Sequence, residues 1–126
     1  MKVSDLPPGR LLSVDPQPRL AEVAREMRGN DADSVAVMED GVLVGIITER
    51  DLVRAIADGV NPTQTAASVI MTADPATVTA DEDVSVVALK MMRLGVRHLP
   101  VVDGNGKPSG LVSARNLVAL LDRAKS

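Results

Sequence analysis

The sequence contains no phenylalanine, tryptophan, tyrosine or cysteine. Aromatic rings normally supply the largest buried areas of a protein core, so this core must be built from many smaller side chains. Valine, leucine, isoleucine, alanine and methionine make up the whole apolar share of 45%, a mixture that suits β-sheets and adaptable helix contacts. The absence of cysteine excludes disulfides and cysteine-ligated metals.

Long hydrophobic runs and a one-sided charge are also missing. No stretch approaches the roughly 20 apolar residues of a membrane-spanning helix, and Met1 to Asp5 lack the apolar run of a signal peptide. We therefore expect a cytoplasmic protein without a membrane partner. The 14 basic and 17 acidic residues give a formal charge of −3 and form no extended basic surface, so nucleic acid is not an expected partner.

Recognisable catalytic and metal-binding motifs are absent as well. With one histidine and no Gly-x-Ser-x-Gly or phosphate-loop pattern, the chain offers no nucleophile paired with a base, and we predict no enzyme activity and no catalytic residue. The acidic residues from Asp31 to Asp40 lack the Asp-x-Asp-x-Asp-Gly order of a calcium loop. No metal site is predicted.

The most informative feature present is an internal repeat. A shift of 64 residues superposes the first part of each copy, and a shift of 65 superposes the rest, as shown by the pairs Val14 and Val78, Met27 and Met91, Gly45 and Gly110, and Leu52 and Leu117. The change of register lies at the turn Asp40-Gly41, where hairpins tolerate insertions. The sequence therefore predicts two repeats, residues 1–60 and 61–126, joined by a linker at 58–64.

Each copy predicts a short strand, a helix, two strands joined by a tight glycine turn, and a closing helix. The first helix of each copy has an apolar stripe at i, i+3, i+4 and i+7, formed by Leu20, Val23, Ala24 and Met27 and by Val84, Val87, Ala88 and Met91. Asp81 is the predicted N-cap of the second of these helices. The hairpin strands are predicted at 34–38 and 42–48 and at 99–102 and 109–113.

The closing helices are predicted to begin at Thr48 and Ser113. Their predicted core residues are Leu52, Val53 and Ile56 in the first copy and Leu117, Val118 and Leu121 in the second. The order β-α-β-β-α in each copy places the chain in the α/β (α+β) class. Because one such repeat is too thin for a full core, we expect the two to pack face to face with pseudo-two-fold symmetry.

This order, the duplication, and the segments Val44 to Asp51 and Val96 to Val102 closely resemble CBS-domain pairs, also called Bateman modules. The resemblance covers nearly the whole chain. It implies that AMP, ADP, ATP or an S-adenosyl compound such as S-adenosylmethionine binds between the repeats as a regulatory ligand, with no obligatory cofactor. It also implies a homodimer formed through helices. As no enzyme is attached within these residues, we expect a free-standing module that signals to a separate, unidentified protein.

The nucleotide signature of that family is glycine, two apolar residues, threonine or serine, two variable residues, and aspartate or asparagine. It occurs twice, at Gly45 to Asp51 and at Gly110 to Asn116. The resemblance implies that Asp51 and Asn116 bind ribose hydroxyls, and that Thr48 and Ser113 reach ribose or phosphate at a helix N-terminus. We expect the stronger site at Asp51, because Asn116 accepts through a single carbonyl oxygen.

The signature also has a structural interpretation, since Thr48 followed by Asp51 is a capping box relative. Its occurrence twice in register favours the ligand interpretation. Arg50 and Arg115 precede the two ribose residues, where they either reach phosphates or remain solvated. Both interpretations of these arginines stay open.

Arg97 and His98 form a basic pair before a predicted strand, and the resemblance implies that such a pair holds phosphates. The equivalent pair in the first copy is Asp33-Ser34, which reverses the charge. One phosphate site is therefore expected rather than two. The alternative is that the basic pair only covers the edge of the sheet.

With no aromatic ring, adenine must lie between aliphatic side chains. The candidates are Val14, Val78 and Pro100, with Thr77 as a possible hydroxyl donor, and all are equally consistent with core positions. The leading hypothesis is thus a nucleotide-binding regulatory module. The alternative is a protein-interaction or dimerisation module with a vestigial ligand site, which the charge reversal at Asp33 and the amide of Asn116 favour.

Overall fold

The computed structural model of the chain describes residues 1–7 and 9–125, with side chains described as far as Leu120. The chain forms two compact units. Unit 1 contains Met1–Arg10 and Ala76–Ser126, and unit 2 contains Leu11–Pro75. The units do not coincide with the sequence repeats. The first segment of each repeat belongs to the unit that is built mainly from the other repeat.

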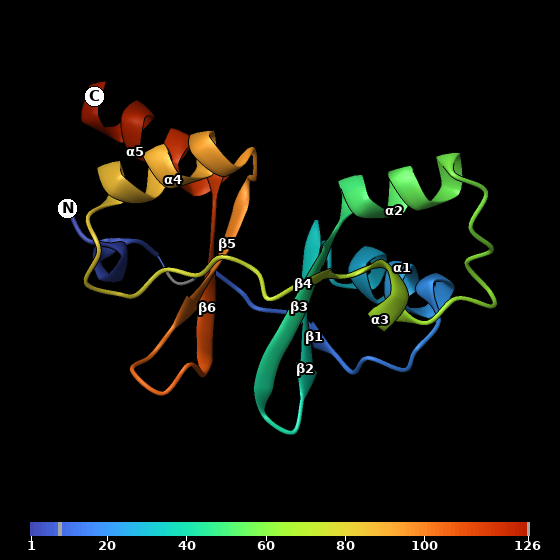
Figure 1. The fold of residues 1–126 in the computed structure, drawn as a ribbon. Coiled ribbons are helices and arrows are strands. Elements are labelled where there is room, and N and C mark those ends of the chain that lie inside the picture. The colour runs from blue at the N-terminus through green and yellow to red at the C-terminus, as the bar shows by residue number, and fades with distance from the viewer. Residues whose placement is uncertain (8, 126) are drawn as a thin grey trace. The chain divides into compact units, whose positions relative to one another are not determined.

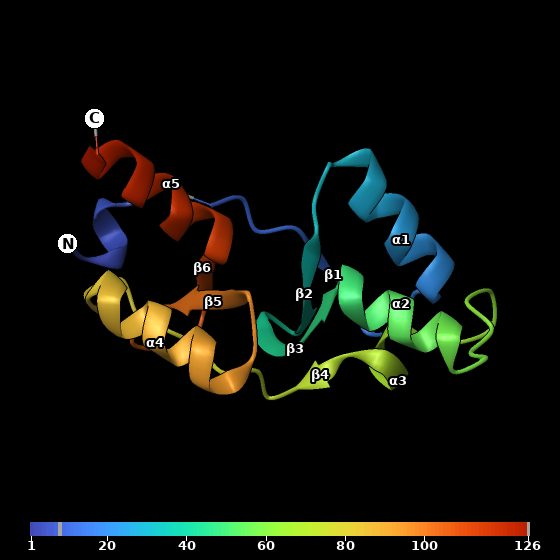
Figure 2. The same ribbon diagram turned by 90° about the horizontal axis from the view of Figure 1, so that it is seen from above.

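Unit 2 is a four-stranded sheet with three helices. Its elements are β1 (Ser13–Val14), α1 (Leu20–Gly29), β2 (Ser34–Glu39), β3 (Val42–Thr48), α2 (Glu49–Ala57), α3 (Ala67–Ile70) and β4 (Thr72–Ala73). The strand order is β1-β2-β3-β4, with β1 parallel to β2 and the other pairs antiparallel. Its helices lie on one side of this sheet in both Figure 1 and Figure 2.

The core of unit 2 follows the alternation of its strands and the stripe of α1. Its buried residues are Leu20, Val23, Met27, Val35, Val37, Ile47, Ala55 and Ala67. Three of the four residues predicted for the stripe of α1 are buried here, whereas Ala24 is exposed. The core side chains are all aliphatic or thioether, as the composition requires.

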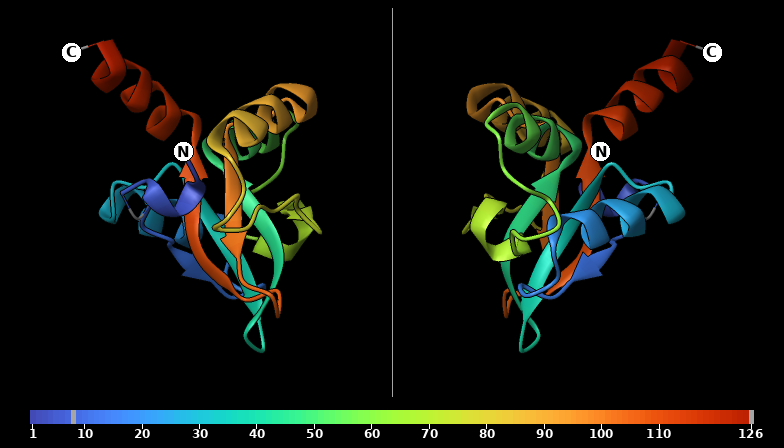
Figure 3. Two further views of the ribbon diagram at one scale, coloured as in Figure 1. Left: turned by 90° about the vertical axis from the view of Figure 1, so that its left-hand side faces the viewer. Right: turned by 90° about the vertical axis from the view of Figure 1, so that its right-hand side faces the viewer.

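Unit 1 has a two-stranded sheet and a separate N-terminal turn. Its elements are the 3-10 helix η1 (Val3–Asp5), α4 (Val84–Leu94), β5 (His98–Val102), β6 (Pro108–Ser113) and α5 (Ala114–Lys125). The short strand predicted at Val78 is reduced to a single parallel bridge with Val101. In the left view of Figure 3, α4 and α5 diverge from this sheet.

The core of unit 1 combines both of its chain segments. It contains Val3, Leu6, Val78, Val87, Met91, Leu99, Val101 and Val112. The backbone amides of Val3 and Ser4 donate to the carbonyls of Glu82 and Ala80, at 2.9 and 2.8 Å. The N-terminal segment therefore belongs to the core of a unit whose other residues begin at Ala76.

Two predictions about the helices were wrong. The N-cap of α4 is Asp83, whose carboxylate accepts from the Ser85 amide at 2.9 Å, whereas Asp81 accepts from the Thr79 hydroxyl at 2.6 Å. The helix starts at Val84, three residues beyond Asp81, so the Asp81 carboxylate belongs to the preceding turn.

The closing helices show a different face from the one predicted. In α2, Leu52 packs against the core and Ala55 is buried, whereas Val53 and Ile56 are both 67% exposed. In α5, Leu117 packs against the core and Val118 is exposed, and Leu121 lies outside the described side chains. Residues i and i+3 of a helix lie on one face, so Leu52 and Ala55 face the core together and Val53 lies on another face.

Two glycines allow the exchanged segments to approach the strands closely. A Cβ built on Gly9 would overlap the backbone carbonyl group of Leu111 in β6, with its carbon at 3.2 Å. A Cβ on Gly45 would lie 2.8 Å from Cγ of Met71, which follows α3. Since backbone cannot yield as a flexible side chain does, Gly9 is the more restrictive of the two positions.

We predict that Gly9→Ala weakens the attachment of the N-terminal segment to unit 1. The added methyl group must displace the segment or β6, which uncovers Val3 and Leu6, and overpacking of this kind costs about 1–3 kcal/mol. Urea denaturation measures the loss. Gly29→Ala is the matched control, because nothing lies within 4 Å of its Cβ and alanine in a helix is favourable by roughly 0.5–1 kcal/mol. Equal stability of the two variants would contradict this prediction.

Acid should weaken unit 1 through the cap of α4. Hydrogen bonds from Ser85 lower the pKa of Asp83. The ionised Asp83 carboxylate therefore stabilises the folded state above the unfolded pKa of aspartate, about 4, and this contribution is lost as the pH falls through the lower pKa of the folded state. We expect the melting temperature to fall more steeply below about pH 4 in the wild type than in Asp83→Asn, which keeps an acceptor but does not titrate. Identical pH profiles would exclude Asp83 as a contributor.

Candidate functional site

The N-terminus of α2 in unit 2 is closed by a reciprocal capping box. The Asp51 Oδ2 atom accepts from the Thr48 amide at 2.9 Å and from the Thr48 hydroxyl at 3.0 Å. The Asp51 amide donates back to Thr48 Oγ1 at 3.3 Å. Among the described residues no donor reaches Asp51 Oδ1. One carboxylate oxygen therefore fixes the helix start, and the other can accept from a ligand.

The N-terminus of α5 in unit 1 repeats this geometry with an amide. The Asn116 Oδ1 atom accepts from the Ser113 amide at 3.0 Å and from its hydroxyl at 2.9 Å, and the Asn116 amide donates to Ser113 Oγ at 3.2 Å. The carbonyl oxygen that the sequence suggested for a ribose is thus already used. What Asn116 can offer a ligand is its NH₂ group, which only donates.

Each hairpin has one face on its core and a second face that carries the predicted site. In unit 2, Ser34 is paired with Thr48 and Ala36 with Ile46, and their side chains alternate with those of the core residues Val35 and Ile47. The second face of unit 2 is therefore formed by Ser34, Ala36, Ile46 and Thr48, and we call it the site face.

Unit 1 has an equivalent site face. His98 is paired with Ser113 and Pro100 with Leu111, whereas the intervening Leu99 belongs to the core. Thus the structure brings His98, Pro100 and Ser113 together on one face, as a ligand site requires. Pro100 is fully buried and His98 half-buried.

The remaining candidates for adenine contact are placed differently. Val14 packs against the core of unit 2, and Val78 is 1% exposed in the core of unit 1. The Val78 side chain therefore belongs to the core, whereas that of Val14 is only partly buried against its core. The backbone carbonyl of Thr77 accepts from the ammonium group of Lys90 at 2.7 Å. That lysine was not singled out from the sequence.

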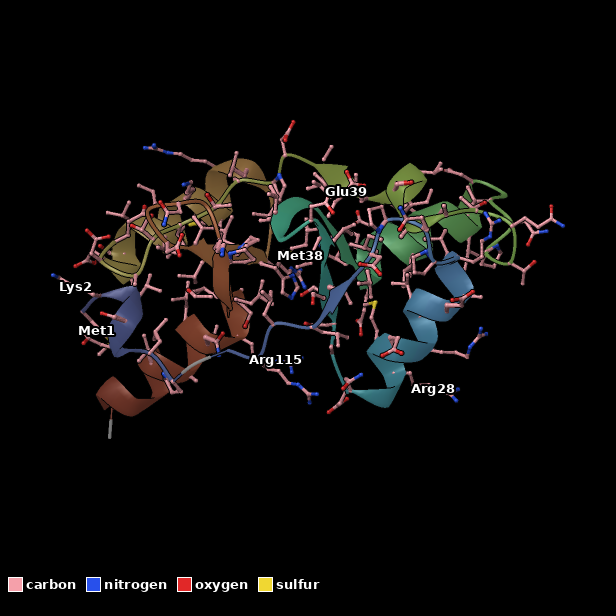
Figure 4. The ribbon with its side chains drawn as sticks, turned by 90° about the horizontal axis from the view of Figure 1, so that it is seen from below. Met1, Lys2, Arg28, Met38, Glu39 and Arg115 are labelled. Carbon is pink, nitrogen blue, oxygen red and sulfur yellow. The ribbon has the colours of Figure 1, made fainter. Side chains whose placement is uncertain are left out.

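Three arginines lie at or beside the two helix starts, and all three are exposed. Arg50 and Arg115 belong to the first turns of α2 and α5, and Figure 4 shows Arg115 extending away from its helix. The Arg97 carbonyl accepts from the Ala114 amide at 2.8 Å. This contact brings the predicted phosphate residues Arg97 and His98 next to the start of α5.

Ser34 lies on the site face of unit 2 and was not among the residues predicted for the site. Its side chain is buried, with 4% exposure, and its Oγ atom has no hydrogen-bond partner. Such buried hydroxyls are normally paired. The available signal was its alignment with His98 in the other copy, but a serine at a strand start gives no hint of burial.

The described residues contain neither a membrane-spanning helix nor a cluster of metal ligands. Within 1–7 and 9–125, no helix has the length and apolar character needed to span a membrane. Across the same ranges, histidine, aspartate and glutamate side chains form no group of three suited to a metal ion.

Comparison with known proteins identifies the fold and the repeat. The CBS domain model matches the chain twice, at residues 3–58 and 66–123. A CBS domain protein from Pyrobaculum aerophilum, solved in complex with AMP, has 29% identity and a TM-score of 0.86, with all of both chains covered. The CBS domain pair of protein MJ0100, in complex with 5′-methylthioadenosine and S-adenosyl-L-methionine, has 25% identity and a TM-score of 0.88 over 98% of each chain.

A relative known from its sequence agrees. An uncharacterized 17.7 kDa protein of Acidianus ambivalens is 38% identical over 123 residues, which cover 96% of this chain and 74% of the relative. The family model matches the chain twice and the solved relatives share the whole fold, so the resemblance noted in the sequence is confirmed. The chain belongs to the CBS-domain family and carries two CBS domains in tandem.

Proposed function

We propose that this chain is a regulatory module that binds an adenosine-type ligand, AMP, ADP, ATP or an S-adenosyl compound, at its site faces. The observation that carries this proposal is the capping box of α2, which orients Asp51 and leaves Oδ1 to accept from ribose hydroxyls. The AMP bound by the Pyrobaculum relative and the two adenosyl compounds bound by protein MJ0100 support the ligand class.

In this proposal the residues contact different parts of the ligand according to their chemistry. In unit 2, Asp51 accepts from the ribose and the positive end of α2 favours electron-rich groups. In unit 1, the NH₂ group of Asn116 donates to ribose oxygens, and Arg97 and His98 attract phosphate. Pro100 lies on the same face but is fully buried, so adenine contacts it only after the side chains that cover it shift.

The ligand acts in this proposal by shifting a conformational equilibrium. It biases the module toward the arrangement to which it binds more tightly, and a separate protein in the cytoplasm recognises that arrangement. The size of the shift is limited by the difference in ligand affinity between the two arrangements. No chemical step is assigned to the module.

A second candidate function is protein interaction or dimerisation with a vestigial ligand site. It is favoured by apolar side chains exposed on helices of both units, namely Val53 and Ile56 on α2, Val86, Leu89 and Met92 on α4, and Val118 on α5. Exposed apolar patches of this kind are typical of association surfaces. A homodimer is compatible with both candidate functions, so ligand binding decides between them.

Calorimetric titration with AMP, ATP and S-adenosylmethionine tests the proposal. We expect saturable binding of at least one ligand by the wild type and a loss of at least about tenfold in the affinity of the Asp51 site in Asp51→Ala, because about 1.4 kcal/mol of charge-assisted hydrogen bonding is removed. The variant should still fold, with about 1 kcal/mol less stability from the weakened cap.

Asp58→Ala is the matched control, since Asp58 is an exposed carboxylate at the C-terminal end of the same helix. It should bind as the wild type does. If the wild type bound none of the three ligands, the result would contradict the proposal and support the interaction module.

Sedimentation tests the dimer separately. We expect a species of twice the 13.2 kDa chain mass at micromolar concentration. The double variant Leu89→Lys with Met92→Lys should shift it to monomer, because two charges would have to be buried. Val42→Lys, at an exposed valine of the β2–β3 hairpin, is the control and should remain dimeric. A wild-type monomer would exclude the dimer.

A further inference from the structure

The two helix starts differ strongly in charge at aligned positions. The aligned residues are Asp33, Ser34, Glu49, Arg50 and Asp51 in unit 2 and Arg97, His98, Ala114, Arg115 and Asn116 in unit 1. Three carboxylates and one guanidinium give unit 2 a net charge of −2, whereas two guanidinium groups give unit 1 a charge of +2 with histidine neutral. These formal charges favour phosphate at the helix start of unit 1 over that of unit 2.

The aligned residues are held close to each helix start by backbone contacts. In unit 2 the Glu49 amide donates to the Asp33 carbonyl at 3.0 Å, as the Ala114 amide does to Arg97 in unit 1 at 2.8 Å. Ser34 and His98 are paired with Thr48 and Ser113, the residues that cap the two helices. The charge difference consequently falls at equivalent places in the two units.

Ser34 gives an independent indication that unit 2 has a working site. Its hydroxyl is buried without a partner on the site face, beside Thr48, and an unpaired buried hydroxyl is costly to keep. An alanine or valine would fit a buried strand position without that cost. The hydroxyl can both donate and accept, so a ligand next to Asp51 would satisfy it.

We propose that unit 2 binds an adenosyl compound without phosphate, neutral or cationic, and that Ser34 Oγ hydrogen-bonds this ligand while Asp51 holds its ribose. Phosphorylated adenosine binds in unit 1. The inference rests on the proposed function and adds to it the ligand class of each unit. Since Ser34 Oγ is covered, the side chains around it must shift when the ligand binds.

The test uses 5′-methylthioadenosine and AMP as probes, titrated separately and each in the presence of saturating amounts of the other. The wild type should bind one molecule of each per chain without competition. Ser34→Ala should weaken 5′-methylthioadenosine about fivefold or more, as expected for one lost hydrogen bond, and leave AMP unchanged. The matched control is Ser68→Ala, at an exposed serine of α3 in the same unit, which should change neither affinity.

Thermal unfolding separates binding from structure. Without ligand, Ser34→Ala should melt at the same temperature as the wild type or a few degrees higher, because it removes an unpaired buried hydroxyl. A lower melting temperature together with unchanged affinity for 5′-methylthioadenosine would make Ser34 purely structural and overturn the proposal.

A charge-conversion variant provides a second test. Asp33→Arg with Ser34→His copies the Arg97 and His98 pair into unit 2, and AMP stoichiometry should rise from one to two per chain. Two AMP molecules per wild-type chain, or competition between the probes for one site, would also overturn the proposal. A wild type that binds neither probe would overturn this proposal, and a wild type that also fails to bind ATP and S-adenosylmethionine would refute the proposed function itself.

Discussion

The structure depends on how each unit completes a core without aromatic side chains. Aliphatic residues bury less area each, and one repeat contributes too few of them for a closed core. Val3 and Leu6 supply the missing area in unit 1, and Ala67 does so in unit 2. In both units the segment that completes the core comes from the sequence repeat that forms most of the other unit. Glycine at positions 9 and 45 lets these segments approach the strands.

Completion of the core on one face of each hairpin leaves the other face available for different chemistry. Alternation along β2 and β5 assigns Val35 and Leu99 to the cores and Ser34 and His98 to the site faces. The capping residue of each closing helix lies on the same site face, because it is paired with the first residue of the neighbouring strand. The same hydrogen bonds that stabilise each helix start also fix the orientation of Asp51 and Asn116.

Much of this could be predicted from the sequence, since it depends on local patterns. The hairpins at 34–39 with 42–48 and at 98–102 with 108–113 lie within a residue of their predicted bounds, because glycine turns and alternation determine them. The elements α3, β4 and η1 were not predicted. They are too short to show periodicity, and their partners are distant in sequence.

The site was predicted less completely than the fold. Its motif residues lie together because the signature is contiguous in the chain, whereas the core positions of Val14 and Val78 depend on tertiary packing. The loss of the Asn116 oxygen to Ser113 and the unpaired hydroxyl of Ser34 are consequences of side-chain geometry, which residue type alone does not specify. The amide and the carboxylate therefore have the same position in the motif, but the carboxylate keeps an acceptor oxygen outside the cap and the amide keeps only its NH₂ group.

The exchange of segments also constrains how such a gene can change. A fragment that encoded residues 61–126 alone would lack Val3 and Leu6, and one that encoded 1–60 would lack Ala67 and β4. Neither fragment carries a complete hydrophobic core. Recombination that moves this module into another gene must therefore transfer both repeats at once, or transfer one repeat that recovers its missing segment from a second copy of itself. A working module is therefore inherited as the pair of repeats, although the sequence that was duplicated is a single repeat.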